Sequence, residues 1–241
     1  KWALDKGIKY KPYNWEKERQ NPKNSFTTMT RYTPYFDDPL LIELHTRFVE
    51  ELAKRYDGNP HISSIDLGGY GNWGEWHTYR LGVPEATPQT RKKFADAYID
   101  NFKKTPIVFM SDDAQTLEYA LEKGGKFPRV GIRRDGVGGP WHYRNWIGSK
   151  KYSRIPKMGE IWKSQPVLLE FISSPNKQKE WSMQRAVDFI LGNHCNVFND
   201  NFHFKNTFTS AQDAPLIEKL KKYIGARIVI DRAHIASDSR S

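Results

Sequence analysis

The sequence predicts an α/β fold, and two observations indicate its type. Short apolar runs, of which residues 106–110 and 166–171 are the clearest, alternate with stretches whose apolar residues recur at helical spacing. Strands that alternate with helices pair in parallel and form a sheet that is buried on both faces. No G-x-G-x-x-G or P-loop pattern follows a strand, which argues against a doubly wound nucleotide-binding sheet. We therefore expect a (β/α)8 barrel, the TIM barrel fold.

Six apolar runs are expected to be strands of this barrel, and polar or glycine-rich sequence follows most of them. The polar residues matter for function, because parallel α/β folds build their sites at the carboxyl ends of the strands. The six runs span residues 8–13, 62–67, 106–110, 129–132, 166–171 and 195–198.

Helical spacing and capping residues predict the helices between the strands. Apolar residues repeat at three- and four-residue spacing over 40–56, directly after Asp37, Asp38 and Pro39, where an Asp suits an N-cap and Pro a first turn. Thr87 and Pro88 open a second helix in the same way. Further helices are expected at about residues 114–123, 180–191 and 214–223.

A (β/α)8 barrel needs eight strands, two more than the six runs found here. Residues 3–7 resemble the last turn of a helix closed by a glycine, so we expect the first two strands to precede Lys1. Residues 1–225 would then hold strands three to eight. Residues 226–241 open with an apolar run, and we expect them to begin an appended β-rich domain or tail.

The chain is basic, with 38 Lys and Arg against 28 Asp and Glu and a formal net charge of +10. The basic residues are spread in short pairs and form no run of about five or six, so we expect no nucleic-acid partner. A polyanion-binding protein stays open as an alternative. No apolar stretch approaches the roughly 18 residues of a membrane-spanning helix, and no membrane partner is expected.

The single cysteine, Cys195, lies in an apolar run and is expected to be a small core residue rather than a nucleophile. His77, His142, His194 and His203 do not have the spacing of metal ligands. We therefore expect no metal and no other cofactor.

Residues 71–77, GNWGEWH, follow a predicted strand and combine a flexible backbone with one acid and two indoles. Aromatic faces stack on the apolar face of a pyranose, and a carboxylic acid can protonate the leaving oxygen of a glycoside. Trp73 and Trp76 would give Glu75 the apolar surroundings of a general acid. The alternative is a structural loop whose tryptophans cap the barrel end while Glu75 pairs with an arginine.

Glu170 lies in the apolar run 166–171, where an unpaired charge is costly to bury. Together with Glu75 it would form the pair of a retaining glycosidase, provided that the two carboxyl groups lie about 5–5.5 Å apart. One glutamate would protonate the glycosidic oxygen and the other would attack the anomeric carbon. The alternative is that Glu170 only forms an ion pair inside the barrel mouth.

A family resemblance supports this pair. Residues 48–77, which include RYDGNPH and LGGYGNWGEWH, resemble bacterial β-galactosidase-like members of the clan A retaining glycoside hydrolases, and especially a group with a G-x-W-G-E-W-H signature. The resemblance covers about residues 1–225 in the order of the elements and is specific over 40–77 and 165–171.

The resemblance implies that Glu75 is the acid/base after strand four and that Glu170 is the nucleophile on strand seven. It also implies a secreted, periplasmic or cell-surface protein. One position departs from the clan pattern: Gly74 directly precedes Glu75 where most members carry Asn, and the nearest Asn is Asn72.

We therefore expect a retaining glycoside hydrolase that cleaves a polysaccharide or oligosaccharide, with a galactan as the favoured substrate. Arg133 and Arg134, close to two tryptophans, would suit an anionic, carrageenan-like sugar, because guanidinium groups grip oxyanions with paired hydrogen bonds. One alternative is that at least one of these arginines pairs with Asp135 or Glu170. Another is a non-catalytic carbohydrate-binding barrel.

The residues expected to contact the substrate lie at or after the strand ends, and several of them would otherwise serve as turn or cap residues. They are Tyr70, Asn72, Trp73, Trp76, His77, Asp112, Asp113, Arg133, Arg134, Trp141, His142, Asn199 and Asp200.

Overall fold

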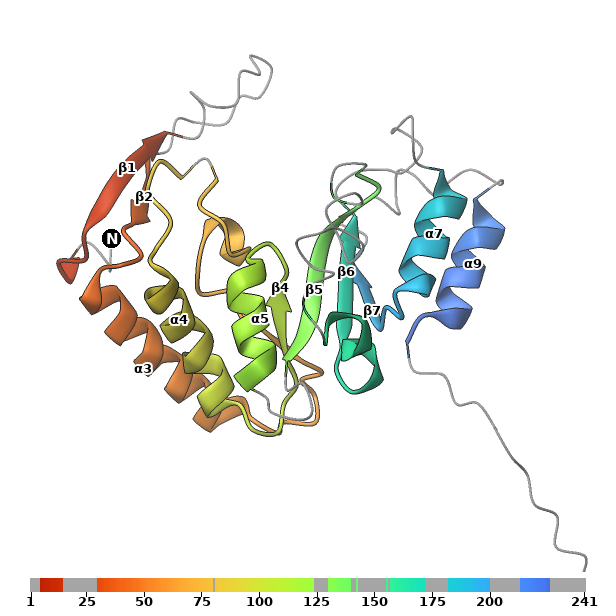
Figure 1. Ribbon diagram of the computed structural model, residues 1–241, viewed down its shortest axis with the longest axis horizontal. Helices are drawn as coiled ribbons and strands as arrows, with labels where there is room; N and C mark the ends of the chain where they lie inside the picture. Colours follow the sequence, from red (N-terminus) through yellow and green to blue (C-terminus); the bar gives the residue numbers. More distant parts are fainter. Residues whose placement is uncertain are drawn as a thin grey trace, which may run out of the picture.

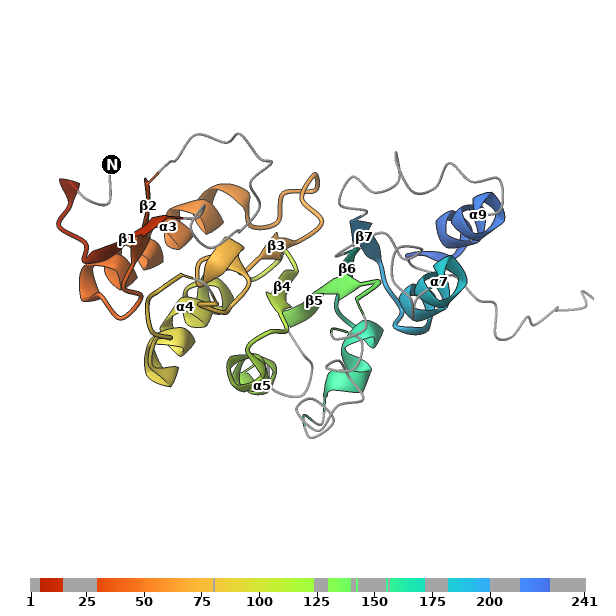
Figure 2. The ribbon, with the colours of Figure 1, turned by 90° about the horizontal axis from the view of Figure 1, so that it is seen from above.

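Five parallel strands form the central sheet of the computed structural model, and they lie side by side in chain order (Figure 1; β3 is labelled in Figure 2). Because each strand pairs with the next, the sheet winds in one direction like half of a barrel. The strands are β3 (Ile65–Asp66), β4 (Ile107–Met110), β5 (Val130–Val137), β6 (Val167–Phe171) and β7 (Val197–Asn199). The structure describes residues 5–14, 30–79, 81–123, 130–139, 142, 155, 157–171, 182–199 and 213–225.

The closed (β/α)8 TIM barrel expected from the sequence is wrong. The described residues hold five parallel strands, and β3 and β7 are the edges of an open sheet. The predicted first strand belongs elsewhere, since β1 (Tyr10–Asn14) pairs antiparallel with β2 (Thr30–Pro34) in a separate two-stranded sheet. An apolar run does not reveal its pairing partner, because parallel and antiparallel strands share the same side-chain alternation. The domain expected at residues 226–241 lies outside the described residues.

The helices lie along the convex side of the sheet, whose strands follow an arc in Figure 2. As predicted, Asp38 caps α3 (Pro39–Tyr56) and Thr87 caps α4 (Pro88–Asn101), each with a side-chain oxygen that accepts backbone N–H groups of the first turn. No helix in the described parts of the chain is both long and apolar enough to cross a membrane. The other helices are α5 (Ala114–Lys123), α7 (Met183–Gly192), α9 (Ala214–Tyr223) and the 3-10 helices η1 (Asn72–Gly74) and η2 (Met158–Lys163).

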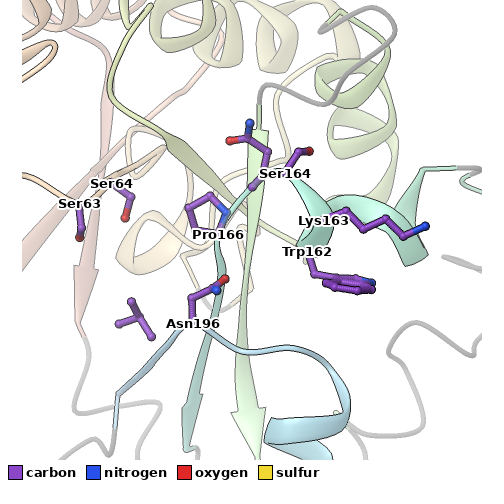
Figure 3. Close-up of a pocket in the computed structure, with 9 residues that line it drawn as sticks. Ser63, Ser64, Trp162, Lys163, Ser164, Pro166 and Asn196 are labelled. Atoms are coloured by element: carbon purple, nitrogen blue, oxygen red, sulfur yellow. The ribbon is translucent and has the colours of Figure 1, made fainter. Parts of the chain in front are cut away.

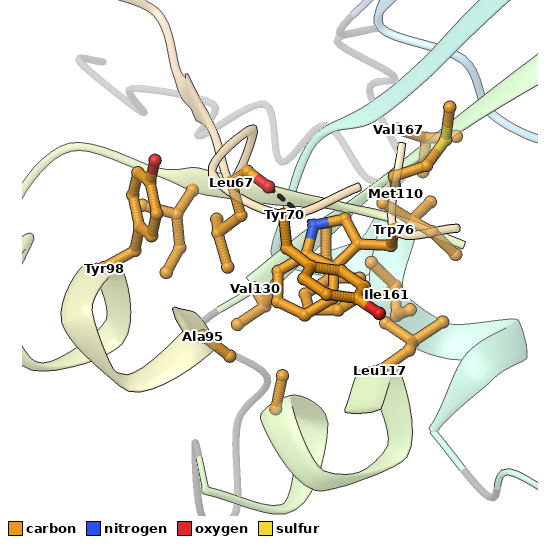
Figure 4. Packing of buried hydrophobic residues seen from close by; sticks show 14 of the residues in the cluster. Leu67, Tyr70, Trp76, Ala95, Tyr98, Met110, Leu117, Val130, Ile161 and Val167 are labelled. Carbon is orange, nitrogen blue, oxygen red and sulfur yellow. Dashed lines mark hydrogen bonds between the residues drawn. The ribbon is translucent and has the colours of Figure 1, made fainter. Parts of the chain in front are cut away.

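The hydrophobic core lies between this sheet and its helices (Figure 4). Every residue of β4 is buried, and Leu67, Trp76 and Leu117 contribute to the same cluster. Each large apolar side chain buried in this way contributes about 1.5–3 kcal/mol. Cys195 also belongs to this core, as predicted, and burial raises the pKa of its thiol to about 12.

The opposite, concave face of the sheet carries polar residues. In β6, Leu169 and Phe171 are buried, whereas Glu170 is only partly buried and lies on the other face. β5 extends beyond the predicted residues 129–132, so Asp135 lies within the strand rather than after it. The strand register pairs Asp135 with Glu170 and Glu170 with Asn199, which brings these three side chains to the same face.

Candidate active site

Arg133 is the centre of a charged cluster toward the carboxyl ends of the strands. Its guanidinium binds Asp135 through two hydrogen bonds, from Nε to Oδ1 at 3.0 Å and from Nη2 to Oδ2 at 2.6 Å. Nη1 donates to Oδ2 of Asp66 on β3 at 2.5 Å, and Nη2 also lies 3.5 Å from Oε2 of Glu170 on β6. One cation therefore faces three carboxylates from three strands. This confirms the alternative in which at least one of the two arginines pairs with Asp135 or Glu170.

Glu170 is anchored through one of its two carboxylate oxygens. Oε2 accepts a hydrogen bond from Nδ2 of Asn199 at 2.7 Å and a longer one from Arg133 at 3.5 Å. Among the described residues, no side chain or backbone group donates a hydrogen bond to Oε1. Glu170 therefore has a fixed orientation and one oxygen left for chemistry.

Glu75 lies on a loop after β3 whose backbone is strained. Gly71 and Gly74 have φ angles of 88° and 77°, and Trp73 and Trp76 adopt left-handed φ angles of 52° and 60°. A residue other than glycine in this region costs about 1–3 kcal/mol and persists only where its surroundings hold it. Such strain concentrates at functional sites.

Trp76 holds this loop in the core. Its indole is 2% exposed and packs against Phe109, with ring centroids 4.2 Å apart. Its Nε1 donates to the backbone oxygen of Leu67 at 2.6 Å, the dashed line in Figure 4. The position of Glu75 therefore depends on the core packing of the next residue, Trp76.

His77 contacts Glu75 from the same loop. Nδ1 of His77 accepts the backbone N–H of Tyr79 at 3.2 Å, so the proton of the neutral imidazole lies on Nε2. Nε2 then donates to Oε2 of Glu75 at 3.3 Å. The pair is partly buried, with both side chains about one-fifth exposed.

The ligand atoms of Glu75, His77 and Asp112 lie within 4.8 Å of one another, close enough to share a cation. The sequence spacing did not predict this group. A histidine that binds a metal usually donates its other ring N–H to an acceptor. In His77 the other nitrogen, Nδ1, is itself an acceptor, so Nε2 keeps its proton. These residues therefore do not fit a metal, and we assign none.

Arg134 lies on the other face of β5 and is buried, with 3% exposed. It forms an ion pair with Asp112, which follows β4. His142 lies within their electrostatic range. Burial lowers the pKa of His142, and the charge of Arg134 lowers it further, against the opposite effects of Asp112 and Glu75. The imidazole of His142 is therefore neutral at pH 7.

Two aspartates that bind Arg133, Asp135 and Asp66, have raised pKa values, mainly because they are buried. Burial raises the pKa of Asp135 to about 7 against the lowering effect of Arg133, and the negative charges of Glu170 and Glu75 add to the increase. Burial also raises the pKa of Asp66, again opposed by Arg133 and assisted by Glu75. Paired carboxyl groups with perturbed pKa values are typical of catalytic sites.

Four residues expected to contact a substrate are buried or bonded within the fold. Tyr70, Asn72 and Trp76 are buried, with 1%, 7% and 2% exposed. Asp113 accepts hydrogen bonds from the first turn of α5 and forms an ion pair with Arg91 at 2.8 Å. These four side chains are therefore engaged within the fold, and their assignment to substrate binding stays a prediction. A strand-end motif in the sequence does not distinguish the side chains that face outward from those that pack inward.

The exposed aromatic residues beside Glu75 are Trp73 and Tyr79, which are 63% and 65% exposed. Their rings each lie 6.4 Å from the ring of His77. Tyr79 was not among the predicted site residues. Trp141 and Asp200 lie outside the described residues.

Sequence reasoning also missed Asp66 and assigned Asp135 no role beyond a possible partner for an arginine. Both are acids within otherwise apolar or alternating strands, the same signal that identified Glu170. Their proximity to Arg133 depends on the strand register, which the sequence does not specify.

A pocket of about 340 Å³ lies at the other end of the sheet (Figure 3). Ser63 and Ser64 before β3, residues 162–166 before β6 and Asn196 before β7 line it. These segments are at the amino ends of the strands, so the pocket is separate from the charged cluster.

No family model and no curated protein sequence matches the chain. The geometry of the cluster therefore carries the functional argument.

Proposed function

We propose that this protein is a retaining glycoside hydrolase in which Glu75 is the acid/base and Glu170 is the nucleophile. The observation that carries the proposal is that Glu170 is held through Oε2 while Oε1 is without a partner among the described residues. Glu75 and Glu170 both raise the pKa of Asp135, so both carboxyl groups lie within electrostatic range of one point. β3 and β6 are also three strands apart, as are strands four and seven of the clan A enzymes that the sequence resembles.

Two carboxyl groups and water are sufficient for the reaction. In the first step, Oε1 of Glu170 attacks the anomeric carbon while the glycosidic C–O bond breaks, and Glu75 gives its proton to the departing oxygen. In the second step, Glu75 takes a proton from water, the water oxygen attacks the anomeric carbon, and the ester to Glu170 breaks. Both glutamates return to their starting protonation states.

We propose a neutral galactoside as the substrate. Galactose follows from the resemblance to β-galactosidase-like enzymes. The anionic, carrageenan-like substrate expected from the sequence loses its main support, because Arg133 and Arg134 are both engaged by carboxylates of this chain.

The test is hydrolysis of neutral galactan oligosaccharides and aryl β-galactosides, measured as new reducing ends and released phenol. Glu75→Gln and Glu170→Gln should each lower kcat by about 10²–10⁴-fold. Glu160→Gln is the matched control, because Glu160 on η2 has a side chain that is 67% exposed and lies outside the cluster. Full activity in either active-site variant overturns the assignment.

A carbohydrate-binding protein without catalysis is the second candidate, and the exposure of Trp73 and Tyr79 favours it. Exposed aromatic faces bind sugars whether or not a bond is cleaved. This candidate predicts galactan binding that Trp73→Ala weakens in calorimetry, with no hydrolysis of any sugar in the panel.

A further inference from the structure

We propose that Asp135 is a positioning residue that keeps Glu170 reactive by holding Arg133 away from it. The inference rests on the proposed function, because it concerns the same nucleophile. Arg133 lies between two carboxylates on neighbouring strands, and the geometry shows which of them binds it more strongly.

Asp135 and Glu170 compete for the same guanidinium nitrogen. Nη2 of Arg133 lies 2.6 Å from Asp135 and 3.5 Å from Glu170, and Nε adds a second bond to Asp135 at 3.0 Å. Bidentate pairs of this kind are the strongest hydrogen-bonded ion pairs in proteins, whereas 3.5 Å is at the limit of a hydrogen bond. The guanidinium of Arg133 therefore binds Asp135 more strongly than Glu170.

Asp66 prevents Arg133 from turning toward the nucleophile. Oδ2 of Asp66 accepts a hydrogen bond from Nη1 of Arg133 at 2.5 Å. Asp66 is on β3, which lies on the opposite side of β5 from the β6 strand that carries Glu170. A rotation that brought the guanidinium closer to Glu170 would break its bonds to both aspartates. Glu170 is therefore oriented by the neutral amide of Asn199 at 2.7 Å, while its negative charge is only weakly neutralised.

This arrangement matters for catalysis because a carboxylate fully paired with arginine is a poor nucleophile. The electron pairs that would attack the anomeric carbon are then engaged by N–H groups. With Asp135 as the preferred partner of Arg133, Glu170 keeps its charge, and the excess negative charge also stabilises the oxocarbenium-like transition state.

The protonation state of Asp135 should therefore affect the pH dependence of kcat. The charged groups with the largest effect on Asp135 are Arg133 on β5, Glu170 on β6 and Glu75 on the loop after β3, and Asp66 on β3 shares Arg133 with it. Burial and these two glutamates raise its pKa to about 7, against Arg133. As the pH falls through 7, Asp135 gains a proton and releases Arg133 to Glu170, so kcat should fall.

The kinetic test compares Asp135→Asn, Asp135→Glu and the control Glu160→Gln on an aryl β-galactoside from pH 5 to 9. Asp135→Asn should lower kcat about 100-fold at pH 8 with KM within about twofold, and it should lose the step near pH 7. Asp135→Glu restores the charge and should recover part of kcat. Equal kcat and an unchanged step in Asp135→Asn overturn the proposal, as does a wild-type profile without any step between pH 6 and 8.

A crystal structure of Asp135→Asn gives a second readout that does not require activity. The distance from Nη2 of Arg133 to Oε2 of Glu170, 3.5 Å in the wild type, should shorten to about 2.9 Å. An unchanged distance overturns the positioning role even if Glu170→Gln is inactive. If Glu75→Gln and Glu170→Gln both remain active while the distance shortens in Asp135→Asn, the proposed function alone is rejected.

Discussion

The two glutamates of the candidate site are built in different ways. Glu170 lies on β6, where hydrogen bonding to β5 and β7 fixes its backbone and where Asn199 orients its side chain. Glu75 lies on a strained loop and depends on the core packing of Trp76. The proposed nucleophile is therefore positioned by the sheet and the proposed acid/base by a loop, and changes to the core beneath the loop should displace Glu75 more than Glu170.

The largest expected effect comes from removing the loop's anchor. Trp76→Ala deletes a side chain that is 2% exposed and the hydrogen bond to Leu67, so it should lower the free energy of unfolding by about 3–5 kcal/mol. Trp73→Ala is the matched control, because the same residue type on the same loop is 63% exposed and should change stability by less than about 0.5 kcal/mol. Urea denaturation of both variants measures the difference, and equal losses would show that Trp76 does not anchor the loop.

A fall in pH should destabilise the protein through His45, which packs beneath the loop. The ring of His45 packs beneath Gly69, where a Cβ would lie 2.0 Å from its Nε2, and burial lowers its pKa from 6.5 to about 4. Between these values the unfolded chain binds the proton and the folded chain does not, so stability is lost as the pH falls from 6.5 to 4, by roughly 3 kcal/mol in total.

His45→Phe tests this expectation, because the variant cannot titrate at this position. Denaturation at several pH values between 4 and 7 should show a smaller pH dependence in the variant than in the wild type. The idea fails if the two proteins lose stability in parallel.

A smaller effect is expected from the loop glycine Gly74. Its φ of 77° is unfavourable for other residues, and a Cβ there would lie 2.5 Å from the backbone oxygen of Gly68. Gly74→Ala should therefore cost about 2 kcal/mol and reduce kcat by displacing Glu75. Gly159→Ala is the control, since a Cβ at Gly159 would meet nothing within 4 Å. Thermal melts of the two variants that coincide would contradict the strained geometry.

The smallest effect on stability is expected from changing Asn199, the hydrogen-bond partner of Glu170. Asn199→Ala removes the 2.7 Å hydrogen bond to Glu170 from an exposed residue, so stability should change by less than about 0.5 kcal/mol. kcat should nevertheless fall about tenfold if Glu170 is the nucleophile, because it loses its orienting donor. Asn199→Asp places a like charge at the same position and should be less active still. An Asn199→Ala enzyme with wild-type kcat would show that the strand alone orients Glu170.

Local sequence signals determined much of the framework. The alternation of strands and helices, the caps at Asp38 and Thr87, and the core position of Cys195 all follow from short-range patterns, and all are found in the structure. Glu75 and Glu170 were selected because acids beside apolar or aromatic residues are costly unless they are used or paired.

Only the tertiary structure decided how these parts combine. It placed the first apolar run in an antiparallel hairpin, left the parallel sheet open with five strands among the described residues, and directed Tyr70 and Trp76 into the core. It also brought Asp66 and Asp135 to Arg133, which turned an expected substrate ligand into the centre of an ion-pair network. The physical reason is the same in each case: strand partners, strand register and side-chain direction depend on residues that are distant in the sequence, whereas helix caps and apolar periodicity depend on near neighbours.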